Sequence, residues 1–163
     1  YDGLRCIDLS TDDFKTEEIL SRHIIHSLYE APQGNIWIGN SEGLAEWNPQ
    51  TQQLKTYTTA HGLSSNAVYA IKGDGQDNLW ISTNAGMSRF NLNTHMFSNF
   101  YADDGLQGNE FSKNASFADH NGILRFGGTN GITYFNPQEI TNPAKKWNVR
   151  IIDFYLHLSL IHI

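Results

Sequence analysis

The stretch Gly34-Asn35-Ile36-Trp37-Ile38-Gly39, followed four residues later by Gly43-Leu44, determines the fold of this 163-residue chain because it returns further along the sequence. Its second copy is Asp77-Asn78-Leu79-Trp80-Ile81-Ser82 with Gly86-Met87. A third, looser copy runs from Asn121 to Gly127 and continues with Gly131-Ile132. Recurrence of this kind predicts an array in which one supersecondary unit is built several times.

The second glycine of each copy gives the period of the repeat. Gly43, Gly86 and Gly131 lie 43 and 45 residues apart, and Gly3 lies 40 residues before Gly43. Each unit contains short apolar runs separated by turn residues, which indicate strands. In the second unit these runs are 67–71, 79–82, 87–90 and 96–100.

Four strands in a unit of about 40–45 residues are typical of a β-propeller blade. The sequence therefore predicts an all-β fold, a partial β-propeller of four-stranded antiparallel blades. Since a closed ring needs roughly four to eight blades, we expect a fragment of a larger, seven-bladed propeller. The expected parts are outer strands of a preceding blade at 1–15, full blades at 22–58 and 64–100, a last and incomplete three-stranded blade at 109–136, and a linker at 137–150.

Six recurring residues have structural explanations. Glycine reaches the positive φ that tight hairpins require, and an indole on the second strand can fill the gap between two twisted blades. We therefore interpret these positions as blade architecture: Trp37, Gly43, Trp80, Gly86, Gly127 and Gly131.

Composition excludes several classes of function. The net charge is −6, and Lys145-Lys146 is the only adjacent basic pair, so neither a nucleic-acid groove nor a surface for anionic membranes is expected. A single cysteine, Cys6, cannot form an internal disulfide. No run of about 18 apolar residues could span a bilayer. Because the chain begins within a blade, we expect the native N-terminus to lie upstream.

The unit from His26 to Pro49 resembles the two-component regulator propeller repeat, whose pattern is roughly D-x-x-G-x-(L/I)-W-I-G-T followed by G-L-x-x-(F/Y)-(N/D)-P. The stretches 104–111 and 126–137 resemble the last such blade in the sensor region of hybrid two-component systems. Ile151-Ile152-Asp153-Phe154-Tyr155-Leu156 is similar to the first strand of the three-tyrosine-type (YYY) β-sandwich that follows the propeller there. The range 151–163 then represents the truncated start of that domain, and residues 157–163 depart from the family.

This resemblance implies a non-catalytic, ligand-sensing fragment of a hybrid histidine kinase regulator that acts in signal transduction through a phosphorelay. It implies a periplasmic location, a carbohydrate signal, and no cofactor. The expected partners are an oligosaccharide ligand, the remaining blades and the β-sandwich of the same full-length chain, and a second copy in a homodimeric full-length sensor.

Motifs for catalysis or metal binding are weak. His23 and His26 have a spacing that places them on opposite faces of a strand, and zinc needs three or four converging ligands. Asp74 to Asn78 looks like a calcium loop but lacks its distant bidentate Glu. No Ser/His/Asp or Cys/His arrangement is indicated, so we predict no catalytic and no metal residues.

The candidate binding surface follows from strand direction. In a four-stranded meander, the loop entering the inner strand and the turn between the second and third strands lie at the same end. Their amides, hydroxyls and charges suit hydrogen bonding to a neutral polar ligand such as a sugar, although turn formation alone explains many of them. The candidates are Arg22, His23, Asn40, Glu42, His61, Asn66, Asn84, Gln107, Asn109, Glu110 and Asn130.

Two other classes of function stay open at this point. The chain could belong to a propeller lyase or hydrolase that acts on polysaccharides and carries its catalytic residues on other blades. It could also be a scaffold whose rim binds another protein. Consumption of an oligosaccharide would favour the enzyme, and absence of sugar binding would favour the scaffold.

Overall fold

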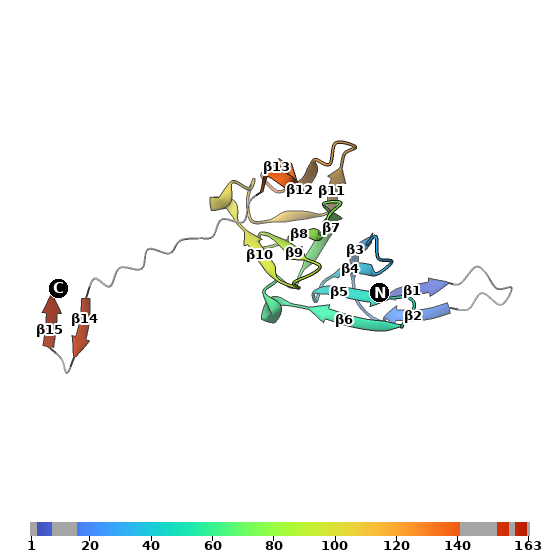
Figure 1. Cartoon of the computed structure of the whole chain (residues 1–163), viewed down its shortest axis with the longest axis horizontal. Helices are drawn as coiled ribbons and strands as arrows, with labels where there is room; N and C mark the ends of the chain where they lie inside the picture. The colour runs from blue at the N-terminus through green and yellow to red at the C-terminus, as the bar shows by residue number, and fades with distance from the viewer. Residues whose placement is uncertain (1–2, 8–15, 141–152, 157–158, 163) are drawn as a thin grey trace.

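The computed structural model of the chain describes residues 3–7, 16–140, 153–156 and 159–162, with side chains for the first two ranges (Figure 1). The regular structure of these residues consists of strands and three short 3-10 helices. Two sheets have four strands each and a third has three, and neighbouring strands within them are antiparallel and consecutive. The predicted all-β fold of four-stranded antiparallel units is confirmed.

The first complete blade contains β3 (Ile25–Glu30), β4 (Ile36–Asn40), β5 (Leu44–Asn48) and β6 (Gln53–Tyr57) in that order. Its turns are closed by short polar side chains and glycine. Gly34 has a φ of 85° in the turn between β3 and β4, and Asn48 Oδ1 accepts hydrogen bonds from the Gln50 and Thr51 amides before β6. These turns explain why the apolar runs end where they do.

The second blade repeats this plan with β7 (Val68–Gly73), β8 (Asn78–Thr83), β9 (Met87–Asn91) and β10 (Phe97–Phe100). Asp74 begins the turn between β7 and β8, where its Oδ1 accepts hydrogen bonds from the amides of Gln76 and Asn78. Asn91 holds the turn before β10 in the way that Asn48 does in the first blade.

The third blade contains β11 (Phe111–Ala118), β12 (Leu124–Gly128) and β13 (Gly131–Phe135). Its longer period arises within β11. Phe111 aligns with Gly128, but the next aligned pair is Ser116 with Phe126, and Asn114 between them has a φ of 56°. The two residues added relative to the second blade therefore form a bulge on the inner strand.

Two hairpins flank the blades. β1 (Leu4–Ile7) pairs with β2 (Thr16–Leu20), so the second of these strands begins after the 1–15 range expected for the outer strands, because Thr16-Glu17-Glu18-Ile19-Leu20 forms a strand. β14 (Asp153–Leu156) pairs with β15 (Ser159–His162) in a separate sheet. The first two residues of the predicted sandwich strand, 151–152, and most of the predicted 137–150 linker lie outside the described residues.

The core lies between the blades, where the inner strands β3 and β7 are neighbours and β7 and β11 are neighbours (Figure 1). Trp37 is 1% exposed in a cluster with Val68, Ile71 and Phe90 of the second blade. Trp80 is 2% exposed and packs with residues of the third blade. The repeated tryptophan thus joins consecutive blades.

Within the described residues, no helix is long and apolar enough to cross a membrane.

Candidate functional site

The candidate surface, which we call the loop face, lies at the end of the blades where chain segments enter the inner strands. Three turns join second to third strands at this end, at residues 40–43, 83–86 and 128–131. Residues 21–24 enter β3 at this end. Two longer loops enter β7 and β11 there and contain the 3-10 helices η1 (Thr59–His61) and η2 (Ala102–Asp104). All eleven predicted binding residues belong to these segments.

In the first blade the loop face carries charged residues. His23 Nε2 lies 3.3 Å from Glu42 Oε2, and the Nδ1 of the same ring lies 2.7 Å from the Ser21 carbonyl oxygen. Arg22 is exposed and has a φ of 61°, a left-handed conformation that non-glycine residues adopt at some energetic cost. Asn40 is buried and its Oδ1 accepts the Glu42 amide at 2.7 Å, so Asn40 shapes the turn.

In the second blade most candidates are engaged within the protein. Asn66 Oδ1 accepts the Thr59 amide at 2.8 Å and so holds η1. The Ser65 hydroxyl donates to Asn84 Oδ1 at 2.7 Å, which joins the entering loop to the turn of the same blade. His61 is exposed, and its Nδ1 accepts the Thr58 amide at 3.1 Å. In this blade, formation of the turn and the loop is enough to explain these side chains.

The third blade is similar. Asn109 Oδ1 accepts the Ala102 amide at 2.7 Å, as Asn66 does one blade earlier. Gln107 Oε1 accepts the Asn130 amide at 2.8 Å, and its Nε2 donates to the Glu110 carbonyl. The Gly86 amide donates to the Asn109 carbonyl at 2.6 Å. This last bond connects the parts of the loop face that belong to the second and third blades.

Equivalent positions of the three blades show which loop-face residues recur in the repeat and which differ from it. His23 corresponds to Asn66 and Asn109, which both hold a 3-10 helix. Arg22 corresponds to Ser65 and Gly108, and Glu42 to Ala85 and Asn130. Among the three described blades, the first therefore has ionisable side chains at three positions where the others have small or amide side chains. Within residues 3–7 and 16–140, the side chains of Arg22 and Glu110 have no hydrogen-bond or ion-pair partner.

Among the residues that the structure describes, no group of three or more His, Cys, Asp and Glu could hold a metal ion. His26 lies away from His23, with its Nδ1 2.7 Å from the Val68 carbonyl and its ring edge against Tyr69. What the loop face offers is a set of hydrogen-bond donors and acceptors.

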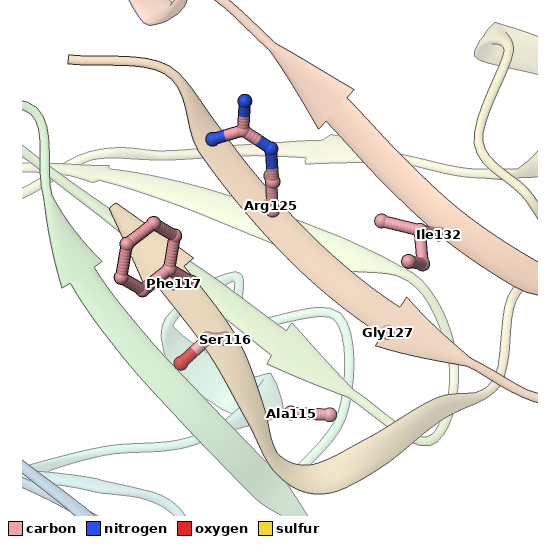
Figure 2. Close-up of a pocket in the computed structure, with 6 residues that line it drawn as sticks. All are labelled: Ala115, Ser116, Phe117, Arg125, Gly127 and Ile132. Carbon is pink, nitrogen blue, oxygen red and sulfur yellow. The ribbon is translucent and has the colours of Figure 1, made fainter. Parts of the chain in front are cut away.

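Sequence reasoning missed a hollow on the face of the third blade. A cavity of about 280 Å³ is lined by Ala115, Ser116, Phe117, Arg125, Gly127 and Ile132 (Figure 2). Arg125 occupies the position of Trp37 and Trp80, a substitution that could have drawn attention to this face. Its Nη1 donates to Asp119 Oδ2 at 2.7 Å, and this bond lowers the pKa of the Asp119 carboxyl below its usual value.

The family model of the two component regulator propeller matches the chain at residues 19–42 and 62–85. Each match spans the loop that enters an inner strand, that strand, and the second strand that carries Trp37 or Trp80. The chain therefore carries two-component regulator propeller repeats, as the sequence pattern predicts. No curated protein matches the chain significantly.

Solved structures support the same fold. The extracellular domain of BT3049 from B. thetaiotaomicron, described as a hybrid two component system, is 28% identical with a TM-score of 0.67, over 69% of this chain and 16% of that one. The extracellular domain of BT4673 from the same organism is 20% identical with a TM-score of 0.66, over 84% of this chain and 21% of that one.

A third likeness is more distant. Virginiamycin B lyase from Staphylococcus aureus is 12% identical with a TM-score of 0.53, over 81% of this chain and 44% of that one. At this identity the likeness shows the propeller fold alone.

The chain spans about a fifth or less of the two extracellular domains. It resembles the sensor domains of hybrid two-component systems.

Proposed function

We propose that this chain is part of a non-catalytic extracytoplasmic sensor, in which a propeller binds a carbohydrate-type ligand at the loop face. The observation that carries the proposal is the combination of two regulator propeller repeats with 28% identity to the extracellular domain of BT3049. The whole protein is then periplasmic and homodimeric. It contains further blades, a β-sandwich after residue 150, and a histidine kinase that starts a phosphorelay.

The chemistry of the first blade supports the proposed ligand class. Arg22 has a guanidinium with five donors, and Glu42 has acceptor oxygens that a hydroxyl can reach. Glu42 is exposed even though it pairs with His23. Vicinal hydroxyl groups of a sugar match such a mixed set of donors and acceptors, and one charge of each sign keeps the site compatible with a neutral ligand.

The repeat itself supports this location. Side chains that recur at equivalent positions, such as Asn66 and Asn109, are used to build the loops. Arg22, His23 and Glu42 break this pattern together, and Arg22 does so in a conformation that most residues avoid. A residue persists in such a conformation where the surrounding contacts fix it, and residues of this kind are enriched at binding and catalytic sites.

Calorimetry with a panel of neutral oligosaccharides tests the proposal, using the extracellular part of the full-length protein. We expect one member of the panel to bind, and Arg22→Ala and Glu42→Ala to weaken its binding at least tenfold. Gln33→Ala is the matched control, since Gln33 is an exposed polar residue in the turn at the opposite end of the first blade. Binding that ignores both loop-face variants would refute the site.

The same samples distinguish a sensor from an enzyme. A sensor returns its ligand unchanged, so chromatography after long incubation should recover all of the bound sugar. Depolymerised or unsaturated products would instead show a lyase or hydrolase. If no oligosaccharide binds while the protein binds another protein through the same rim, the scaffold function is the correct one.

A further inference from the structure

The segment that enters the first blade, residues 21–24, is held differently from the loops that enter the other two blades. In the second blade the Ser64 amide donates to the Ser88 hydroxyl at 3.0 Å. In the third blade the Gln107 amide donates to the Thr133 hydroxyl at the same distance of 3.0 Å. Both hydroxyls belong to buried residues of the third strand. Each of these bonds ties an entering loop to its own sheet without an ionisable group.

The first blade has no hydroxyl at this position. By strand register, Ala45 of β5 occupies the place that Ser88 has on β9. A methyl group cannot accept a hydrogen bond from the Ser21 amide, which is the counterpart of the Ser64 amide. The bond that holds the other two entering loops to their third strands is therefore missing from the first blade.

An ionisable pair holds the entering segment in its place. His23 Nε2 lies 3.3 Å from Glu42 Oε2, and His23 Nδ1 lies 2.7 Å from the Ser21 carbonyl oxygen. Because a carbonyl and an ionised carboxylate only accept hydrogen bonds, both ring nitrogens have to donate, and only the imidazolium carries a proton on each. The two contacts of His23 are thus those of its charged form, and the neutral ring can make only one of them.

The charges around His23 leave Glu42 as its counterion. On the neighbouring elements, the ionisable side chains have other partners: Glu17 pairs with Gln52, Glu18 with Arg5, and His26 with the Val68 carbonyl. The corresponding segment of the second blade, 63–67, contains no ionisable residue. Arg22 is the adjacent cation on the segment itself, and it is exposed to solvent, which screens its repulsion.

We propose that the His23–Glu42 pair is a proton-controlled latch that positions Arg22 at the loop face. Histidine changes its charge between about pH 5 and pH 8. At the lower end of this range both bonds form and hold the segment against the turn. As the pH rises, His23 loses its Nε2 proton and the bond with Glu42, and no hydroxyl on β5 replaces that bond. The consequence for a ligand rests on the proposed function: a sugar held by Arg22 and Glu42 binds more tightly at mildly acidic pH.

Two equivalent backbone bonds report whether an entering segment is in place. The Ser41 amide donates to the Ile24 carbonyl in the first blade at 3.2 Å. The Thr129 amide donates to the Glu110 carbonyl in the third blade, also at 3.2 Å. Each bond breaks when its segment leaves the turn. Hydrogen exchange at single-residue resolution can follow both amides in the extracellular part of the full-length protein without sugar, with rates corrected for the intrinsic effect of pH.

We expect the protection of the Ser41 amide to fall about two- to fivefold between about pH 5.5 and about pH 8, the effect of one exposed ion pair. The Thr129 amide is the internal control and should keep its protection, because its segment is held by neutral groups. Glu42→Ala should give low protection of Ser41 at both pH values. Ala45→Ser supplies the hydroxyl that Ser88 provides in the second blade and should keep Ser41 protected at both.

Three outcomes would overturn the proposal: constant protection of Ser41 across this range, an equal fall at Thr129, or a pH dependence that survives Glu42→Ala. His23→Asn gives a second test that does not depend on how the Ala45 variant folds, since asparagine already stands at the equivalent positions 66 and 109; it should abolish the pH dependence at Ser41. No sugar is present in these measurements. Their failure is therefore distinct from a failure of carbohydrate binding, which calorimetry tests separately.

Discussion

Substitution of Gly39 by alanine tests whether the blades are held at a fixed separation by their second strands. Gly39 lies on β4, facing the inner strand of the second blade. A Cβ atom there would lie 2.5 Å from the Ser27 hydroxyl oxygen and 2.6 Å from Val68 Cγ1. Val68 is 0% exposed within the core between the two blades, so it can move only by disturbing its neighbours.

The magnitude follows from two opposing effects. Overpacking a well-packed core costs about 1–3 kcal/mol. Replacing glycine by alanine at a compatible φ gains about 0.4–1 kcal/mol by restricting the unfolded chain. We therefore expect Gly39→Ala to lower the free energy of unfolding by about 1–2 kcal/mol, as measured by urea denaturation with tryptophan fluorescence.

The repeat provides two matched controls at equivalent positions. Ser82 already carries a Cβ, and its buried hydroxyl has no hydrogen-bond partner within the described residues, so Ser82→Ala should be neutral or slightly stabilising. Gly127 faces the open side of the third blade, and a Cβ there meets only Ala115 at 3.0 Å among side chains; Gly127→Ala should cost less than Gly39→Ala. Equal midpoints for Gly39→Ala and the wild type would refute the reasoning.

Three further predictions concern packing, a loop and pH. Trp80→Ala should lower the free energy of unfolding by about 3–5 kcal/mol, because Trp80 is 2% exposed between two blades; a loss below 1 kcal/mol in urea denaturation would contradict this. Asn66→Ala should cost about 1 kcal/mol and speed hydrogen exchange at the Thr59 amide, which Asn66 Oδ1 accepts; unchanged exchange would argue against that role. The Asp119 carboxyl has a lowered pKa, so its bond with Arg125 stabilises the fold fully at pH values above the ordinary carboxyl pKa of about 4, and this contribution is lost as the pH falls through the lowered pKa. Asp119→Asn should therefore reduce the dependence of the melting temperature on acidic pH. A melting profile that does not change with this substitution would exclude the pair as the source of that dependence.

The blade plan was accessible from sequence because it depends on local chemistry. Turn residues such as Asp74 and Asn48 end the strands through hydrogen bonds to amides two to four positions away. Trp37 and Trp80 are large enough to need an interblade position. These features repeat, and repetition separates them from chance.

The bulge in β11 was less accessible. The 45-residue spacing between Gly86 and Gly131 showed that two residues were added. Only the pairing of Phe111 with Gly128 and of Ser116 with Phe126 places these residues on the inner strand. The start of β2 was displaced from its expected range for a similar reason. Glu17 and Glu18 give this stretch no apolar run, and only their pairing with Cys6 and Arg5 of β1 makes them part of a strand.

The candidate site divides in the same way. Strand direction alone placed all eleven candidates in the segments of one face, since the alternation of up and down strands is a property of the chain. Which of them are free to meet a ligand depends on contacts across the sequence. Asn66 and Asn109 each hold a 3-10 helix that begins seven residues earlier.

By itself the sequence determined the blade, its period and the positions that build it, because hairpins and turns are encoded within a few residues. Only the tertiary structure separated the structural asparagines from Arg22, His23 and Glu42 of the first blade, and only it showed that no strand within the described residues pairs with the outer edge of β13. Both depend on long-range hydrogen bonds and on which surfaces other strands cover. The burial of Leu44 and the exposure of Ile132 at equivalent positions of one repeat show that difference directly.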